Sequence, residues 1–183
     1  MIPPNESRES RPAVFLDRDG TIMRDADYCG HPRQVAVFPG ASDALQRIRA
    51  AGFQIFIITN QSGIGRGYFS ETDYHAVAEE VERQLGIGLI DGTYFCPDVP
   101  DNGSLRRKPA PGMILEAQRD HALDLTRSFM VGDKAVDMEC GRNAGVRTIL
   151  VHTGDAKQLG SSSADWEARD LSEAAEIILR HGL

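Results

Sequence analysis

Short apolar runs recur along the chain, and polar residues follow them. The runs cover residues 13–16, 53–58, 93–96, 128–131 and 148–152, and the third run is the weakest. Apolar runs of this length that contain β-branched and aromatic residues are typical of buried strands. The pattern therefore predicts five strands.

Helical spacing of apolar residues fills the intervals between these runs. The intervals with this spacing cover residues 41–51, 70–85, 111–123, 135–143 and 172–180. Gly52 and Gly86 suit helix C-termini, because glycine readily adopts the left-handed conformation found there. Ser70 opens a capping sequence, S-E-T-D, and Pro111 suits a first helical turn. We therefore predict five helices that alternate with the strands.

The alternation of strands and helices indicates a Rossmann-like α/β fold. Its expected core is a doubly wound, mainly parallel sheet with helices on both faces. In such sheets, ligands bind at the carboxyl ends of the strands. Because Asp17, Thr59 and Asp133 follow apolar runs, we expect a polar site where these ends meet.

The length of 183 residues suits a single domain. We predict a disordered or frayed tail over residues 1–12, which are polar and contain proline, and a single domain over residues 13–183. The sequence contains no internal repeat and no segment with the composition of a domain linker.

Charge and composition narrow the expected partners. The formal net charge of −7 disfavours a nucleic-acid partner, which needs clustered lysine and arginine, but a local cation site can still bind a small phosphorylated molecule. No apolar run has the length of a membrane span, and the polar N-terminus does not resemble a signal peptide. Cys29, Cys96 and Cys140 are far apart, which favours a reducing cytoplasm over a disulfide scaffold. We expect a cytoplasmic protein with no membrane partner, and a monomer because no apolar surface stripe is evident.

The first sequence with candidate chemistry is D-R-D-G-T at residues 17–21. A lone D-x-D is typical of an aspartate-rich surface turn. After a buried strand, however, the chain turns at Gly20, and the carboxylates of Asp17 and Asp19 can converge on one point. Two close carboxylates are costly unless a cation or a proton lies between them. This motif therefore indicates a cation site.

Two further motifs offer groups that bind phosphate. The sequence T-N-Q-S-G-I-G-R-G-Y-F at residues 59–69 combines a hydroxyl, an amide and glycine-rich backbone, which suit an oxyanion cradle as well as a long turn. In R-R-K-P at residues 106–109, Lys108 can neutralise a phosphoryl oxygen and Arg107 can bind a phosphate with two hydrogen bonds. By itself, a basic run of this kind is usually a solvated surface.

The last motif is V-G-D-K-A-V-D-M at residues 131–138. Asp133 ends a predicted strand and Asp137 lies one helical turn later, so both can face the same metal ion. Asp133 could instead serve as a helix N-cap. Oxygen ligands without a cluster of histidine and cysteine favour Mg²⁺ over zinc.

These four motifs, in this order, resemble the phosphatases of the haloacid dehalogenase superfamily. Within that superfamily, D-R-D-G-T-I, the residue 59–69 sequence, R-K-P-x-P-G-M and V-G-D-K-x-x-D-M are similar to the heptose bisphosphate phosphatases and the histidinol-phosphate phosphatases. The residue 59–69 sequence favours the heptose group. The resemblance covers about residues 13–152. It implies a fold without a large cap domain, which fits the short connection from Gly20 to Gly40.

The resemblance implies a role for each matched position. Asp17 is the expected nucleophile and a Mg²⁺ ligand, and Asp19 is the expected acid/base, with its backbone carbonyl on the metal. Thr59 and Lys108 are expected to stabilise the transferring phosphoryl group. Asp133 is expected to complete the metal site, with Asp137 as a possible second-shell residue. The positions that match substrate contacts are Asp25, Tyr28, Asn60, Gln61, Ser62, Arg107 and Lys134.

One segment departs from the pattern of these families. Many members carry a zinc loop of the form C-P-H-x-P…C-x-C-R-K-P. Here Cys96 remains, but Asp98 stands at the histidine position, and Ser104 and Arg106 stand at the last two cysteine positions. A four-ligand zinc site cannot form from these residues, and we expect no zinc.

Together, the motifs and the resemblance imply a Mg²⁺-dependent phosphomonoester hydrolase that forms an aspartyl-phosphate and acts on a small sugar phosphate. D-glycero-D-manno-heptose 1,7-bisphosphate, losing its 7-phosphate, is the first substrate to test. Alternatives are histidinol phosphate or another small metabolite. The acidic charge disfavours a polynucleotide 3′-phosphatase, and the small predicted cap disfavours a phosphotransferase, which must exclude water. A protein that only binds phosphate would not need both Asp17 and Asp19.

Overall fold

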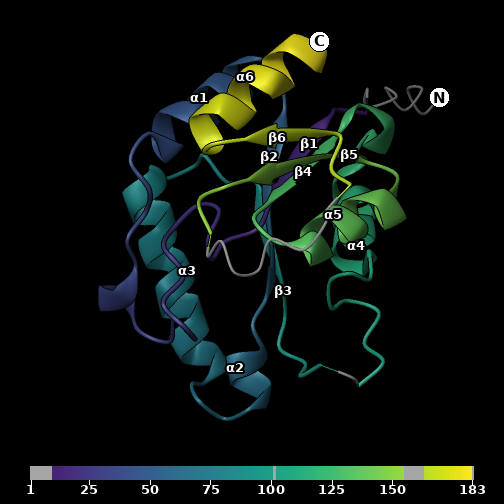
Figure 1. Ribbon diagram of the computed structural model, residues 1–183. Coiled ribbons are helices and arrows are strands. Elements are labelled where there is room, and N and C mark those ends of the chain that lie inside the picture. Colours follow the sequence, from purple (N-terminus) through teal and green to yellow (C-terminus); the bar gives the residue numbers. More distant parts are fainter. Residues whose placement is uncertain (1–9, 101, 155–162, 183) are drawn as a thin grey trace, which may run out of the picture.

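A parallel sheet forms the centre of the protein. The computed structural model describes residues 10–100, 102–154 and 163–182. Within these residues the sheet has six strands in the order β3-β2-β1-β4-β5-β6, and every neighbouring pair is parallel (Figure 1). The strands are β1 (Ala13–Leu16), β2 (Gln54–Asn60), β3 (Gly92–Cys96), β4 (Phe129–Gly132), β5 (Arg147–Val151) and β6 (Trp166–Ala168).

Helices cover both faces of this sheet, which confirms the predicted doubly wound fold. The α-helices are α1 (Ala41–Ala50), α2 (Ser62–Gly65), α3 (Glu71–Leu85), α4 (Gly112–His121), α5 (Ala135–Ala144) and α6 (Leu171–His181); short 3₁₀ helices cover Pro32–Gln34 and Leu125–Arg127. Helices α1, α3 and α6 pack on one face of the sheet, and α4 and α5 pack on the other (Figure 1).

Alternating side chains of each strand supply the two cores. In β1, Val14 and Leu16 point to the face covered by α1, α3 and α6, while Ala13 and Phe15 point to the face covered by α4 and α5. All four residues are fully buried. Because both faces are covered, the strand is a continuous apolar run rather than an alternation of apolar and polar residues.

The chain reverses its direction of winding between β1 and β4. From β1 it proceeds outward through β2 to β3, and the later strands β4, β5 and β6 extend to the other side. Loops on the two sides of such a reversal diverge, which leaves a crevice at the carboxyl ends of the two central strands. Asp17 follows β1 and Asp133 follows β4, so the topology brings both residues to this crevice.

Local contacts adjust several predicted boundaries. Strand β2 continues to Asn60, so Thr59 lies within the strand rather than after it. Pro111 is the N-cap of α4 rather than a residue of its first turn. The predicted capping box at the start of α3 is confirmed, because Ser70 accepts a hydrogen bond from the Asp73 backbone N–H and the Asp73 side chain accepts one from the Ser70 N–H.

Besides the two 3₁₀ helices, one strand and one α-helix were not predicted from the sequence. Strand β6 has only three residues, and it pairs with β5 at the edge of the sheet. Helix α2 has four residues and lies inside the glycine-rich sequence that was interpreted as a cradle or turn. Elements this short show too little apolar periodicity to be recognised in a sequence.

The residues before β1 are joined to the domain from at least Arg11 onward. The Arg11 carbonyl accepts a hydrogen bond from Asp124 N, and the Pro12 carbonyl accepts one from Gln54 N. The rest of the predicted tail, residues 1–9, lies outside the described residues.

Among the described helices, none combines the length and apolar character needed to cross a membrane. Cys29, Cys96 and Cys140 are buried free thiols.

Truncation of Phe56 tests the packing of the α4–α5 side of the sheet. The Phe56 ring is fully buried, and its centroid lies 5.7 Å from that of Phe15. Phe56→Ala is expected to lower the free energy of unfolding by about 3–5 kcal/mol, because it leaves a cavity in a close-packed core. Ile87→Ala, at a side chain that is 87% exposed, is the control and should change this value little. Urea denaturation measures both, and equal small losses would contradict the described packing.

Candidate active site

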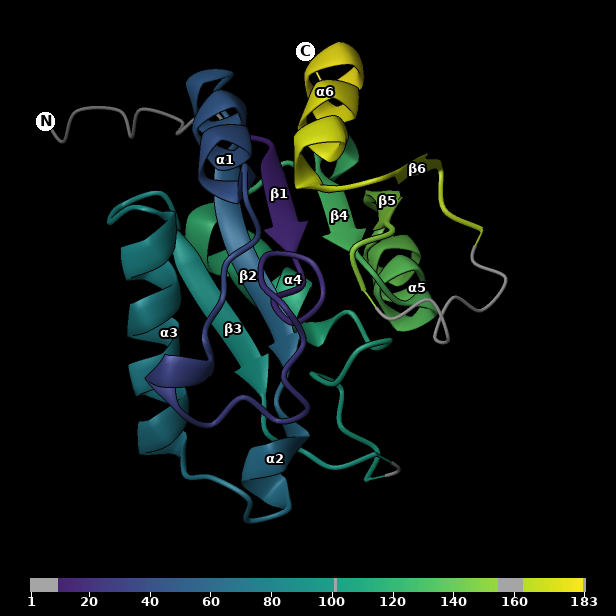
Figure 2. The ribbon, with the colours of Figure 1, turned by 60° about the vertical axis from the view of Figure 1, so that its left-hand side comes forward.

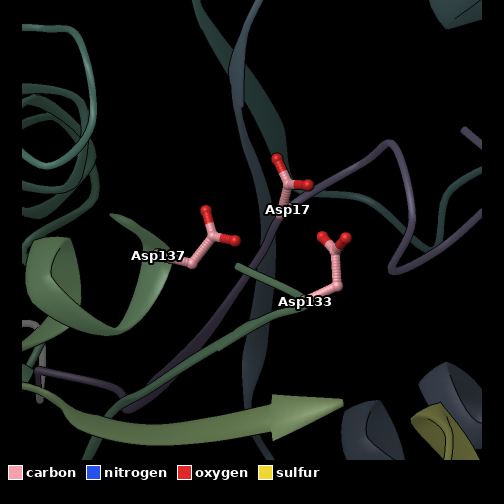
Figure 3. A group of neighbouring side chains, drawn as sticks. All are labelled: Asp17, Asp133 and Asp137. Carbon is pink, nitrogen blue, oxygen red and sulfur yellow. The ribbon is translucent and has the colours of Figure 1, made fainter. Parts of the chain in front are cut away.

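Three buried carboxylates converge at the crevice between β1 and β4. Asp17, Asp133 and Asp137 each place a carboxylate oxygen within 4.8 Å of the others, and Figure 3 shows the three side chains pointing into one common space. The backbone N–H of Asp17 donates to Val131 O at 2.9 Å, which fixes the end of β1 against β4. The two motifs at residues 17–21 and 131–138 therefore meet, as their positions after strands predicted.

Two glycines make room for the Asp133 carboxylate. A Cβ atom added to Gly20 would lie 2.3 Å from Asp133 Oδ2, and one added to Gly154 would lie 2.0 Å from it. Gly20 also has a φ of 90°, a conformation that disfavours other residues. Thr21 Oγ1 donates to Asp133 Oδ1 at 3.3 Å. The glycine of D-R-D-G-T is therefore needed for the approach of Asp133 as well as for the turn.

Asp137 joins the start of α5 to the site. Its Oδ2 atom accepts a hydrogen bond from the backbone N–H of Lys134, the N-cap residue of α5. The alternative that Asp133 is the N-cap is therefore wrong. The Oδ1 atom of Asp137 lies 2.6 Å from Lys108 Nζ. Asp137 thus accepts a hydrogen bond at the start of α5 and forms an ion pair with the buried Lys108.

Lys108 places a positive charge between two of the carboxylates. Its Nζ atom lies 2.5 Å from Asp17 Oδ1 and 2.6 Å from Asp137 Oδ1. Burial lowers the pKa of Lys108, but the charges of Asp137 and Asp17 outweigh burial and raise it above its usual value. The ammonium group is therefore protonated at neutral pH. The basic motif at residues 106–109 places one of its members in the interior instead of on a solvated surface.

Negative charge remains in excess around Lys108. Burial, with a smaller contribution from the charge of Asp17, raises the pKa of Asp133 to about 7. Burial also raises the pKa of Asp137, although Lys108 opposes this. A divalent cation beside Asp17 and Asp133 would remove the excess charge. A buried set of carboxylate oxygens without thiol or imidazole fits Mg²⁺ by ligand type.

Asp19 is held by a buried arginine that the sequence analysis did not single out. Arg18 Nη2 lies 2.9 Å from Asp19 Oδ2, and Gln61 Nε2 donates to the same oxygen at 2.9 Å. The Arg18 side chain is 1% exposed, and its guanidinium carbon lies 5.7 Å from the centre of the Tyr74 ring. Burial raises the pKa of Asp19, and Arg18 only partly offsets this. Arg18 stands between Asp17 and Asp19 in the sequence, and this position between two acidic residues at a strand end could have indicated its role.

The residues after β2 connect the motifs to one another. Asn60 Nδ2 donates to the Lys108 carbonyl at 3.1 Å, and Lys108 N donates to Asn60 Oδ1 at 3.0 Å. Gln61 Nε2 also donates to Thr59 Oγ1 at 2.8 Å. The Asn60 amide is therefore used to hold the Lys108 backbone, whereas the sequence analysis expected this motif to bind phosphate.

A cavity of about 200 Å³ opens beside Asp19, and most of the expected substrate residues lie around it. The expected residues that line it are Asp25, Tyr28, Asn60, Gln61, Ser62 and Lys134. Lys134 Nζ forms an ion pair with Asp25 Oδ2 at 3.0 Å across this cavity's rim. Arg107 is placed differently: its Nη1 atom donates to the Asp98 carbonyl at 2.7 Å.

A larger hollow of about 1090 Å³ lies beside Arg11, Gly52 and Gln54, at the amino ends of the strands. It is wide but does not include the converging carboxylates of Asp17 and Asp133. These carboxylates lie at the opposite ends of the strands. Asp19 and Lys134, which line the smaller cavity, lie beside them, so the smaller cavity is the candidate active site.

The residues at the zinc-loop positions do not fit a zinc ion. Cys96 Sγ lies 3.4 Å from Asp98 Oδ2 and 3.6 Å from Ser104 Oγ. The fourth position, Arg106, instead pairs with Glu116 at 3.0 Å. A structural zinc site needs four thiolate, imidazole or carboxylate ligands, and a hydroxyl and a guanidinium cannot supply two of them.

Mg²⁺ is expected to stabilise the protein more at pH 8 than at pH 6. A proton bound to Asp133 up to about pH 7 must leave before the carboxylate binds a cation, so affinity for Mg²⁺ increases as pH rises. Saturating Mg²⁺ at a hundredfold excess over Kd stabilises a folded protein by about 2.7 kcal/mol. Thermal denaturation with and without MgCl₂ at the two pH values measures this effect. A pH-independent shift, or an equal shift in Asp133→Asn, would contradict the assignment of Asp133 as a ligand.

Comparisons with known proteins agree with this geometry. A family model described as "HAD-hyrolase-like" matches residues 105–174. The chain is 38% identical to D-glycero-D-manno-heptose-1,7-bisphosphate 7-phosphatase of Thermosynechococcus vestitus, over 93% of this chain and 97% of the relative. It is also 38% identical to D-glycero-beta-D-manno-heptose-1,7-bisphosphate 7-phosphatase of Yersinia pestis, over 93% and 96% of the two chains.

A solved structure supports the same relationship. The crystal structure of D,D-heptose 1,7-bisphosphate phosphatase from B. bronchiseptica, complexed with magnesium and phosphate, matches with a TM-score of 0.84 and 32% identity. The match covers 92% of this chain and 98% of that one. Identity at this level over nearly the whole of both chains extends the relationship beyond a shared fold. This chain is therefore a phosphatase of the haloacid dehalogenase superfamily, and it belongs to the family of the heptose bisphosphate phosphatases.

Proposed function

We propose that this phosphatase removes the 7-phosphate of D-glycero-D-manno-heptose 1,7-bisphosphate with Mg²⁺, and that Asp17 is its nucleophile. The observation that carries the chemistry is the placement of Asp17 beside both Lys108 and Asp133 at the topological reversal of the sheet. The substrate is proposed from the names of the relatives. The buried free thiols support a cytoplasmic enzyme, and we propose that it acts as a monomer.

Asp17 starts the reaction as the attacking group. One of its carboxylate oxygens forms a bond to phosphorus while the bond between phosphorus and the sugar oxygen breaks, which leaves an aspartyl-phosphate. Repulsion between a carboxylate and a phosphate dianion opposes this step. Lys108 lowers the repulsion because its ammonium group lies 2.5 Å from Asp17 Oδ1. Mg²⁺, when bound by Asp17 and Asp133, supplies further positive charge to the phosphoryl oxygens.

Asp19 is the proposed acid and base. The proton that it holds goes to the departing sugar oxygen, and the resulting carboxylate then takes a proton from the water that attacks phosphorus. This second attack breaks the bond between phosphorus and Asp17 and releases phosphate. The raised pKa of Asp19, which is caused by burial, favours the protonated form needed in the first step. Thr59 donates to the developing negative charge.

The groups around the cavity support a small anionic substrate. Lys134 carries a positive charge beside the cavity, and burial, which lowers its pKa, is outweighed by Asp133, Asp17 and Asp25, which raise it. Arg107 is the proposed contact for a more distant phosphate or hydroxyl of the substrate. A volume of about 200 Å³ suits a single sugar unit better than a polymer.

A substrate panel tests the proposed function. Phosphate release with Mg²⁺ is measured for both anomers of heptose 1,7-bisphosphate, fructose 1,6-bisphosphate, histidinol phosphate and a 3′-phosphorylated oligonucleotide. We expect a heptose bisphosphate to exceed the others in kcat/KM by about a hundredfold or more, because correct positioning is needed for transfer. Low and uniform rates, or a higher rate with histidinol phosphate, would remove the heptose assignment.

The nucleophile is tested in the same assay. Asp17→Asn is expected to lower kcat by about a thousandfold or more without loss of the folded state, because an amide cannot form the acyl-phosphate. Asp43→Asn, at an exposed residue of α1, is the matched control and should retain full activity. Circular dichroism checks that both variants fold. Substantial turnover by Asp17→Asn would exclude Asp17 as the nucleophile even if the heptose substrate is correct.

The loop around Cys96 is proposed to hold its shape without zinc. Metal analysis of the purified protein is expected to find far less than one zinc per chain, and a zinc-selective chelator should leave the Mg²⁺-dependent rate unchanged. The physical reason is that Asp98, Ser104 and Cys96 contact one another directly, while Arg106 pairs with Glu116. One zinc per chain, with loss of activity when it is removed, would contradict this proposal.

A further inference from the structure

The outer side of the active-site cavity is formed by an exposed aromatic residue in an unusual backbone conformation. Tyr28 lines the cavity, and it is 46% exposed. Its φ angle is 68°, and that of the preceding residue, Asp27, is 44°. Two successive non-glycine residues in the left-handed region are costly, and such strain concentrates at functional sites. The backbone conformation that places the Tyr28 ring at this position therefore lowers the stability of the folded protein.

A second tyrosine supports this ring from a different segment of the chain. Tyr68 lies with its ring centroid 4.9 Å from that of Tyr28, and the two ring planes meet at 84°. This edge-to-face geometry is a favourable arrangement for aromatic pairs. Tyr68 does not line the cavity and is 62% exposed. Tyr68 can therefore influence the cavity through its contact with the Tyr28 ring.

The segments that carry the two tyrosines are also joined by Phe69. A Cβ atom added to Gly30 would lie 2.8 Å from Phe69 Cβ, and one added to Gly63 would lie 2.2 Å from Phe69 Cε1. Phe69 therefore occupies space that glycine leaves on both segments. The backbone N–H of Tyr68 donates to Gly63 O at 2.8 Å. Figure 2 shows the segment after β1 curling beneath the end of that strand, on the side where α2 lies.

We propose that Tyr68 is a positioning residue for substrate specificity: it holds the Tyr28 ring as a wall against which the carbon–hydrogen face of the substrate's sugar packs. A sugar ring presents an apolar face and a polar edge. The cavity offers the matching arrangement, with Tyr28 as the apolar wall and Asp25, Ser62 and Lys134 as polar groups. This inference rests on the proposed sugar phosphate substrate, but it does not depend on which sugar is used.

The experiment compares a substrate that has a sugar ring with one that has none. Tyr68→Ala is assayed with the best sugar phosphate of the panel and with acetyl phosphate, which carries its phosphoryl group on a small acetyl group and has no sugar ring. We expect kcat/KM for the sugar phosphate to fall about tenfold, mostly through KM, while the value for acetyl phosphate changes less than about twofold. Tyr68→Phe keeps the aromatic contact and should behave as the unaltered protein. Ile87→Ala, at an exposed side chain on the loop after α3, is the control for loss of apolar surface.

A double-mutant cycle separates action through Tyr28 from an independent effect. If Tyr68 acts by holding Tyr28, Tyr68→Ala adds little to the loss caused by Tyr28→Ala, so the two effects are not additive. Equal losses with both substrates, additive losses, or full activity of Tyr68→Ala with the sugar phosphate would overturn the proposal. Absence of sugar phosphate turnover in the unaltered protein, with acetyl phosphate turnover retained, would instead show that the proposed function itself fails.

Discussion

The site depends on the repulsion among three buried carboxylates that share one small space. Asp17, Asp133 and Asp137 lie close enough that their charges disfavour one another, and burial removes the water that would screen them. Lys108 offsets part of this charge by contacting Asp17 and Asp137. Lys134, whose Nζ atom lies 3.9 Å from Asp133 Oδ2, offsets a further part. Burial, with a smaller contribution from the charge of Asp17, raises the pKa of Asp133 to about 7, and a divalent cation would stabilise its ionised form. A bound cation would relieve the repulsion among the carboxylates, and together with Lys108 it would then attract a phosphate.

The fold holds this unfavourable cluster together by using groups that also build the secondary structure. The reversal between β1 and β4 brings Asp17 and Asp133 to the same crevice, and the Asp137 carboxylate closes the first turn of α5. Lys108 is fixed through its backbone by the Asn60 side chain at the end of β2. A change at any of these residues therefore alters local folding and site charge together. For this reason, activity and stability should be measured side by side in variants of the site.

The sequence predicted the parts of the site that follow from strand position. Asp17 and Asp133 were recognisable because they follow apolar runs, and the strand ends of a parallel sheet meet at one edge. The roles of Arg18 and Tyr68 were not predicted from local sequence. Burial of the Arg18 guanidinium depends on Tyr74 and Gln61, which are distant in the chain. The short strand β6 and the true end of β2 were also missed, because tertiary pairing decides where a strand stops.

The proposed mechanism requires that the transferred phosphoryl group forms a covalent bond to Asp17. The direct measurement is to quench the enzyme in acid during turnover, reduce any acyl-phosphate with borohydride, and map the product by mass spectrometry. Reduction converts an aspartyl-phosphate to homoserine. We expect homoserine at position 17, dependent on substrate and Mg²⁺ and absent from Asp17→Asn. Homoserine at another aspartate, or turnover with no modified residue under conditions that trap the intermediate in a related phosphatase, would contradict it.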